Sequence, residues 1–417
     1  MNQSHRRRRL PQLIALGALA ALALAACGNT STTSSGGSVN VALDTSLSGS
    51  FGFFGLANQN AAKLTIEQIN QGGGLLGKQV NLQVKDDGGA PNVASDLVRT
   101  QVLNDHIVAL FGGVSSSVAL AEQTLVAKYK IPFIVHTSNT DKLTVDKFNN
   151  YTFSVVPNTG MEGRANAMAA AKLPYTKYYL IGPDYEFGHS QLAAFKAKLT
   201  ELKPGVTFAE DYPKLGATDY STYISKIQAA QPEVVYSAEF AGDLITFLTQ
   251  ARSTGLVGKP TSPKFMGLFD VDTLRNLGAN APTGAYAYGR APFFAIKTPA
   301  MDKFVKDFQD RYNIPPSDWA VMAHDAVIAW SEGVKKAGSF DGDKVSQAMS
   351  GMTFESARGK LTLRSVDHQV DCSEYEGTLQ ADPKIGFNSF ADVVAVPGKD
   401  ILLPEDKVKS IRAAAGG

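Results

Sequence analysis

Three consecutive serines form a cluster that could do chemistry. Ser115, Ser116 and Ser117 follow the apolar run Ile107–Phe111 and two glycines. The turn is similar to the nucleophile elbow of hydrolases, but Ser117 stands where that motif requires glycine, and no placement of His and Asp supports a triad. The same hydroxyls, with the free N–H groups of a helix N-terminus, would bind a carboxylate or similar anion. Ordinary N-capping by Ser115 or Ser116 explains the pattern equally well.

A glycine cluster at Gly72–Gly77 has the G-x-G-x-x-G spacing of nucleotide sites and is followed by Lys78. Phosphate-binding glycines follow a strand and begin a helix, whereas these end a helical segment and precede a strand. Gln79 also replaces the Ser or Thr that would bind Mg²⁺. A helix C-cap and turn explain the cluster better, so we expect no nucleotide there.

Metal and cofactor chemistry finds no support in the pattern of ligating residues. The chain has two cysteines, and its six histidines show no ligand spacing. We therefore expect neither a metal nor a cofactor.

Aromatic residues gather in a loop after the first apolar strand. Phe51, Phe53 and Phe54 lie in this Gly/Ser-rich loop, where parallel α/β folds border their ligand crevice. These rings would line a pocket or pack under the loop. Trp319 and Trp330 lie on an apolar helical segment and indicate core or interlobe packing.

The N-terminus has the pattern of an export signal. Arg6–Arg9 are basic, and 14 residues without a polar side chain follow, from Leu13 to Ala26. That run is shorter than the roughly 20 residues of a membrane span, so residues 1–26 are expected to be a signal peptide. The ending Leu-Ala-Ala-Cys resembles the lipobox of bacterial lipoproteins, which implies cleavage before Cys27, lipidation of its sulfur and attachment to a membrane.

Composition describes an ordinary globular protein behind this signal. The chain has 417 residues, 40 Lys+Arg, 39 Asp+Glu and 44% hydrophobic residues. This length predicts two domains, and the balanced charge argues against a nucleic-acid partner. Residues 27–37 are small and polar and should form a flexible tether.

From residue 38 onward, strand-like and helix-like runs alternate. Apolar strands that alternate with helices predict parallel sheets covered on both faces. We therefore expect an α/β protein with two doubly wound parallel-sheet lobes. A β-like tail from Gly359 to Val396 is too short for a domain and should complete these lobes.

An ordered set of short motifs resembles the leucine/isoleucine/valine-type solute-binding proteins of ABC importers, and it covers almost everything after the tether. The motifs are Leu47-Ser-Gly49, Gly55, Ile69-Asn70, Gly73-Gly74, Gly77-Lys78, Asp86-Asp87, Gly112 to Ser117, Ile131-Pro132, Leu143-Thr144, Pro183 to Gly188, Pro232 to Tyr236, Gln250 to Leu256 and Asp367 to Gln369.

This resemblance implies a type I periplasmic-binding fold, in which two lobes joined by three crossovers close over a ligand. The N-terminal lobe would comprise residues 38–154 and 287–355, and the C-terminal lobe residues 155–286 and 356–403. Residues 404–417 would form a tail. The crossovers are expected near residues 151–157, 281–286 and 353–359.

The resemblance also implies a set of ligand-binding residues. In relatives, the serine-bearing turn and the loop after the next strand hold the carboxylate of an amino acid, while aromatic residues flank its body. Glu239 or Asp270 would supply an acid for its ammonium group. The positions that match are Phe54, Ser116, Ser117, Ser138, Asn139, Phe187 and Phe240, and Glu239 and Asp270 are the nearby candidates for the acid.

Three departures from the family pattern bear on the ligand. Asn139 stands where relatives often have Thr, the disulfide frequent among leucine-binding relatives is absent, and Phe269 aligns with an acid that holds the ligand ammonium. An unpaired buried ammonium is costly, so loss of that acid would favour a ligand without one.

The first hypothesis is therefore a lipid-anchored, extracytoplasmic solute-binding protein that delivers its ligand to an ABC permease and its ATPase subunits. Branched-chain or other amino acids are the first ligand class, and aromatic carboxylates or amide- and urea-like solutes are the alternatives. An exported sensor that signals through a membrane receptor and a hydrolase using Ser115 or Ser117 are the competing hypotheses; we expect a non-enzyme.

Overall fold

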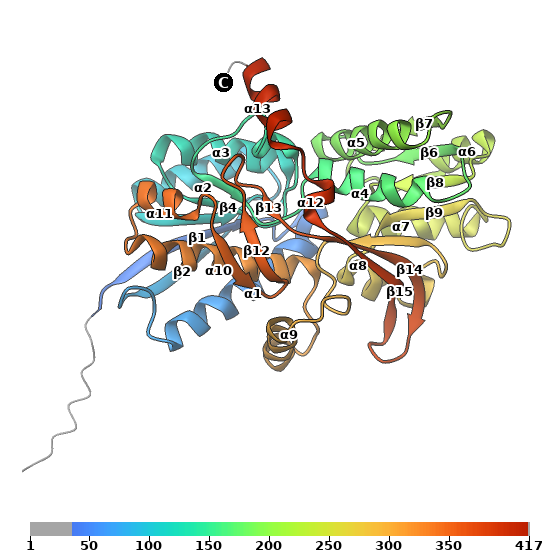
Figure 1. Cartoon of the computed structure of the whole chain (residues 1–417). Coiled ribbons are helices and arrows are strands. Elements are labelled where there is room, and N and C mark those ends of the chain that lie inside the picture. The colour runs from blue at the N-terminus through green and yellow to red at the C-terminus, as the bar shows by residue number, and fades with distance from the viewer. Residues whose placement is uncertain (1–35, 416–417) are drawn as a thin grey trace, which may run out of the picture. The chain divides into compact units, whose positions relative to one another are not determined.

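Five parallel strands form the first large sheet in the computed structural model, which describes residues 36–415 (Figure 1). The expected signal peptide, the lipidation site Cys27 and residues 28–35 of the tether lie outside the described residues. The strand order is β2-β1-β3-β4-β5. The strands are β1 (Ser38–Thr45), β2 (Gln79–Asp86), β3 (Ile107–Gly112), β4 (Phe133–Val135) and β5 (Thr152–Ser154).

Helices cover both faces of this sheet because alternate strand residues point to opposite sides. Val41 and Leu43 share a core with α1 (Gly52–Gln71) and α10 (Asp318–Ala337). Ala42 lies between them in sequence and belongs to a second core, with α2 (Pro91–Leu103) and α3 (Ser116–Tyr129). The run Val39–Leu43 is apolar on both faces for this reason.

The second large sheet has seven strands in the order β15-β14-β10-β9-β8-β6-β7. Five strands are parallel, while β14 and β15 add antiparallel partners beside β10. The strands are β6 (Lys177–Ile181), β7 (Thr207–Asp211), β8 (Val234–Ser237), β9 (Lys264–Leu268), β10 (Tyr286–Gly289), β14 (Glu374–Asp382) and β15 (Phe387–Val396).

This sheet is also covered on both faces. Tyr178 and Leu180 pack with α4 (Thr159–Ala171) and α5 (Glu186–Leu202). The intervening residues of β6 pack with the helices of the other face, α6 (Ser221–Ala230), α7 (Ala241–Ser253) and α8 (Val271–Leu277). Two doubly wound parallel sheets confirm the expected fold class. Within residues 36–415, no helix combines the length and the apolar character needed to cross a membrane.

A small third sheet packs with the first core. It contains β11 (Thr353–Ser356), β12 (Gly359–Leu363) and β13 (Val370–Asp371), and Phe354 and Leu363 share the core of Val41. The chain also contains α9 (Pro299–Tyr312), α11 (Gly342–Met349), α12 (Gly398–Ile401) and α13 (Glu405–Ala414).

Two of the three passages between the large sheets lie at other residues than the expected crossovers. The strand β10 pairs in the second sheet as far as Gly289, so the chain leaves that sheet later than residues 281–286. Residues 353–371 belong with the first core because their apolar side chains are buried there. The third passage therefore lies between β13 and β14 rather than at residues 353–359.

Candidate ligand-binding site

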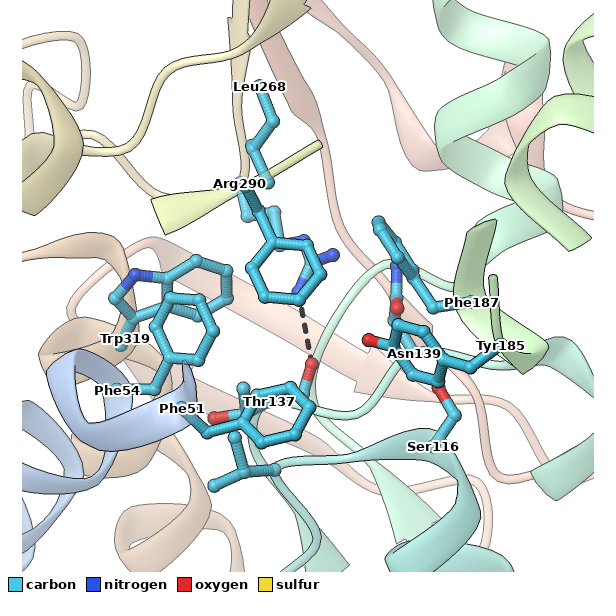
Figure 2. Close-up of a pocket in the computed structure, with 12 residues that line it drawn as sticks. Phe51, Phe54, Ser116, Thr137, Asn139, Tyr185, Phe187, Leu268, Arg290 and Trp319 are labelled. Carbon is cyan, nitrogen blue, oxygen red and sulfur yellow. Dashed lines mark hydrogen bonds between the residues drawn. The ribbon is translucent and has the colours of Figure 1, made fainter. Parts of the chain in front are cut away.

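A pocket lies where the loops at the carboxyl ends of both large sheets meet (Figure 2). Loops after β1, β3 and β4 contribute from the first sheet, and the ends of β6, β8, β9 and β10 contribute from the second. This is the position at which open α/β sheets bind ligands. The lining residues are Phe51, Phe54, Val114, Ser116, Thr137, Asn139, Tyr185, Phe187, Phe240, Leu268, Arg290 and Trp319.

Aromatic rings fill most of this pocket. Phe51 stacks on Phe240 with 5.9 Å between ring centroids, and Phe54 lies 5.6 Å from Phe240 and 4.3 Å from Trp319. The remaining cavity is about 20 Å³. That volume suits one water molecule, whereas ligand pockets usually reach roughly 300–1,000 Å³. These rings must therefore move before a small organic molecule can enter.

Arg290 is the one cationic side chain among these lining residues. It follows β10 directly and is only 3% exposed. Its Nε donates to Glu162, and its Nη1 donates to the Thr137 carbonyl at 3.0 Å, which Figure 2 shows as a dashed line. Its guanidinium lies 4.9 Å from the centroid of Trp319 and 6.0 Å from that of Phe187. Arg290 thus connects the second sheet to the β4 loop of the first.

Glu162 balances this buried charge from the first turn of α4. Its side chain is fully buried, and its Oε2 accepts a hydrogen bond from Asn139 at 2.9 Å. Burial raises the pKa of Glu162, and the positive charge of Arg290 opposes that rise. Burial by itself would lower the pKa of Arg290, but the charge and hydrogen bond of Glu162, together with Glu374 and Tyr288, raise it. Glu162 is therefore already engaged by two residues of the pocket.

The N-terminus of α3 contributes a second feature suited to anions. Ser115 occupies the N-cap position with extended backbone, but no side chain caps the helix there. Ser116, the first helical residue, is buried and lines the pocket. Because the first N–H groups of a helix lack intrahelical partners, this end can bind an anion.

Five of the nine predicted site residues line the pocket: Phe54, Ser116, Asn139, Phe187 and Phe240. They come from segments that follow strands of both sheets. Their role in binding stays a prediction.

The two other predicted serines do not line it. Ser117 lies one residue further into α3, and Ser138 is buried behind the β4 loop, where its N–H donates to the carbonyl of Gly113 at 2.7 Å. In residues 36–415, no hydrogen bond joins Ser115, Ser116 or Ser117 to a histidine, as nucleophilic catalysis would require.

The two predicted acids are engaged outside the pocket lining. Asp270 caps α8 by accepting hydrogen bonds from the N–H groups of Asp272 and Thr273 at 3.0 and 3.1 Å. Glu239 accepts a hydrogen bond from Tyr220 at 3.1 Å, and burial raises the pKa of Glu239 to about 8. Neither carboxylate reaches the pocket to hold an ammonium group.

Phe269, which aligns with the acid that holds the ligand ammonium in relatives, does not face the pocket. Phe269 is fully buried in the core on the α7 and α8 side of the sheet and lies 6.0 Å from Phe265. Leu268 is the residue that faces the pocket, because successive side chains along β9 point to opposite faces.

Arg290, Thr137 and Tyr185 are the polar lining residues that sequence reasoning missed, and Trp319 was interpreted only as packing. One signal was available for Arg290: a lone cation directly after the apolar strand Tyr286–Gly289. In the described part of the chain, no group of three or more His, Cys, Asp or Glu residues is placed to hold a metal ion.

Several proteins are similar to this chain along most of its length. The leucine-, isoleucine-, valine-, threonine- and alanine-binding protein of Pseudomonas aeruginosa is 23% identical over 358 residues, which is 86% of this chain and 93% of that protein. The Leu/Ile/Val-binding protein homolog 3 of Brucella melitensis is 26% identical over 320 residues, 76% of this chain and 84% of that protein.

Solved structures share the fold. An ABC-transporter solute-binding protein of Rhodopseudomonas palustris in complex with 3,4-dihydroxybenzoic acid has a TM-score of 0.78 and 24% identity, covering 86% of this chain and 98% of that one. The branched-chain amino acid transporter substrate-binding protein LivJ of Streptococcus pneumoniae, in complex with isoleucine, has a TM-score of 0.75 and 20% identity, covering 86% and 100%. The family described as periplasmic binding protein matches residues 38–380, and the chain belongs to that family, with the type I fold that its motifs predicted.

Proposed function

We propose that this protein is the extracytoplasmic solute-binding component of an ABC importer and that its ligand is a small carboxylate with an apolar, preferably aromatic, body. The observation that carries the ligand class is Arg290, a buried cation in a pocket that has no acidic side chain among its lining residues. A carboxylate ligand gains a charge-assisted hydrogen bond there, while an ammonium group meets no acidic side chain among the lining residues.

In this proposal the two ends of the ligand have different surroundings. The carboxylate lies between Arg290 and the uncapped N-terminus of α3, and the body takes the space now filled by Phe51, Phe54 and Phe240. These rings belong to loops of both sheets, so a ligand in contact with all of them stabilises the arrangement in which the sheets approach each other. The division into two lobes that separate to admit the ligand belongs to this proposal.

Membrane attachment and delivery to a permease complete the proposal. Residues 1–26 would be removed, Cys27 would carry lipid, and a partner ATPase would supply the transport energy. The sequence pattern of the N-terminus and membership of the family support this part.

A branched-chain amino acid is the second candidate ligand, because two similar proteins carry leucine, isoleucine and valine in their names. Titration calorimetry of residues 28–417 with benzoate, benzamide and leucine separates the candidates. We expect benzoate to bind about ten- to a hundredfold more tightly than benzamide, since a hydrogen bond to a charged group contributes roughly 1.5–3 kcal/mol. Tighter binding of leucine than of benzoate, or equal binding of benzamide, would overturn the proposed ligand class.

Two arginine variants test the part played by Arg290. Arg290→Met should lose benzoate binding. Arg358→Met is the matched control, because Arg358 forms an equally buried ion pair with Asp325 at 2.7 Å but does not line the pocket. Arg358→Met should therefore bind benzoate as the natural protein does.

A further inference from the structure

A second carboxylate, Glu374, lies beside Arg290 and takes no part in the site described above. The strands β10 and β14 pair antiparallel, with Tyr288 opposite Glu376 and Gly289 opposite Tyr375. One further step in this register places Arg290 opposite Glu374. Directly opposed residues of antiparallel strands share a face, with their Cβ atoms about 4.5–5.5 Å apart.

Glu374 is fully buried and has no bonding partner. Its exposed fraction is 0%, and within residues 36–415 neither side-chain oxygen accepts a hydrogen bond. Arg290 forms its ion pair with Glu162 and not with Glu374. A buried carboxylate in this position is costly when ionised, and burial followed by the charge of Glu162 raises the pKa of Glu374 well above its ordinary range, with Arg290 opposing the shift.

The surroundings of Glu374 contain one cation and several acids. Arg290 is that cation, and Glu162 already neutralises it. The titratable groups near Glu374 are Glu162 from α4, Arg290 after β10, Asp318 from the first turn of α10, Tyr236 from β8, and Cys372, Tyr375 and Glu376 from its own segment. Arg290 and Glu162 balance each other, so ionisation of Glu374 adds a negative charge beside the guanidinium that no further cation compensates.

From this arrangement we infer that Glu374, which lies opposite Arg290 in the strand register and does not line the pocket, determines specificity through that arginine: only in its uncharged form does it allow an anionic ligand to share the guanidinium. The inference rests on the proposed function. An ionised Glu374 would be a second protein carboxylate close to Arg290 and would repel the ligand carboxylate through a desolvated interior. A neutral ligand of the same shape would experience no such repulsion.

The test is the pH dependence of benzoate binding by residues 28–417, measured by titration calorimetry from pH 5.5 to 9.5. Benzoate stays ionised over this range. The natural protein should bind with constant affinity at low pH, and affinity should then fall by up to tenfold per pH unit as Glu374 loses its proton. Glu374→Gln should keep the low-pH affinity and abolish the fall. The matched control Glu376→Gln, two residues away on the same strand face but hydrogen-bonded to Tyr286, should retain the fall.

A second measurement needs no variant. Calorimetry of the natural protein in buffers of different ionisation enthalpy reports the protons taken up on binding, and we expect uptake to rise from zero at low pH towards one proton per benzoate at high pH. A fall in affinity that persists in Glu374→Gln, or the absence of proton uptake across the range, overturns the inference. Such a result leaves benzoate binding intact at low pH, whereas failure of the proposed function would abolish binding at every pH.

Discussion

Removal of the buried cation at position 290 should unfold the protein more readily, and the structure gives the size of the effect. Arg290→Met deletes the ion pair with Glu162 and the hydrogen bond to the Thr137 carbonyl. Glu162 then remains fully buried with only the neutral amides of Asn139 and Gln191 as partners. Loss of one member of a buried pair costs about 3–5 kcal/mol, because the surviving charge has no compensation.

The second substitution isolates this cause. In Arg290→Met/Glu162→Gln the uncompensated charge is gone, and the glutamine oxygen still accepts from Asn139. We expect the double variant to recover most of the loss. The free energy of unfolding of Arg290→Met should also rise by about 1.4 kcal/mol for each pH unit by which the pH is lowered, since an isolated Glu162 with a raised pKa can take up a proton.

The assay is urea unfolding without ligand at pH 8 and pH 5, followed by circular dichroism. Arg358→Met should show a comparable loss from its own buried pair and no recovery on Glu162→Gln. The reasoning fails if Arg290→Met is within 1 kcal/mol of the natural protein at pH 8, or if the double variant is no more stable than the single one.

Three further predictions concern other parts of the molecule. Burial raises the pKa of Asp44 to about 7, so the folded state holds a proton that the unfolded chain releases near pH 4. The free energy of unfolding should therefore fall between about pH 4 and 7. In urea titrations, Asp44→Asn should remove up to roughly 4 kcal/mol of that fall. A Cβ at Gly55 would lie 1.9 Å from the Ser46 carbonyl, so Gly55→Ala should lose about 1–3 kcal/mol, whereas the control Gly242→Ala, with open space around its Cβ, should lose none; equal unfolding midpoints would contradict this. Cys27→Ser should release the protein from the membrane fraction and abolish labelling by radioactive palmitate in growing cells, and a labelled variant would refute lipidation at that position.

Periodicity predicted the fold because strand and helix patterns are local. The apolar run Val39–Leu43 lies in β1, and the helical spacing of Leu244 and Phe247 lies in α7. The strand β9 carries a weaker local signal, because Lys264–Leu268 is short and includes a glycine. The third crossover was predicted at the wrong position because residues 353–371 pack in the first core, and this long-range packing cannot be inferred from a local sequence pattern.

The site was predicted in part for a similar reason. Aromatic and serine positions in loops could be carried over from family motifs. Along a strand, however, alternate residues face the pocket, so an error of one residue in the alignment exchanges Leu268 for Phe269. The pairing of Arg290 with Glu162 spans 128 positions, and its neighbour Glu374 is set by strand register. Long-range pairs of this kind arise only once the sheets are assembled.

The rings of Phe51, Phe54 and Phe240 give ligand binding an unusual thermodynamic character. A ligand that enters a hydrated cleft buries new apolar surface and lowers the heat capacity. Here the entering molecule replaces phenyl rings already shielded from water, so one apolar packing is exchanged for another. The heat-capacity change of binding should consequently be small. The apparent affinity is the intrinsic affinity multiplied by the fraction of molecules in which these rings have already moved out of the ligand position.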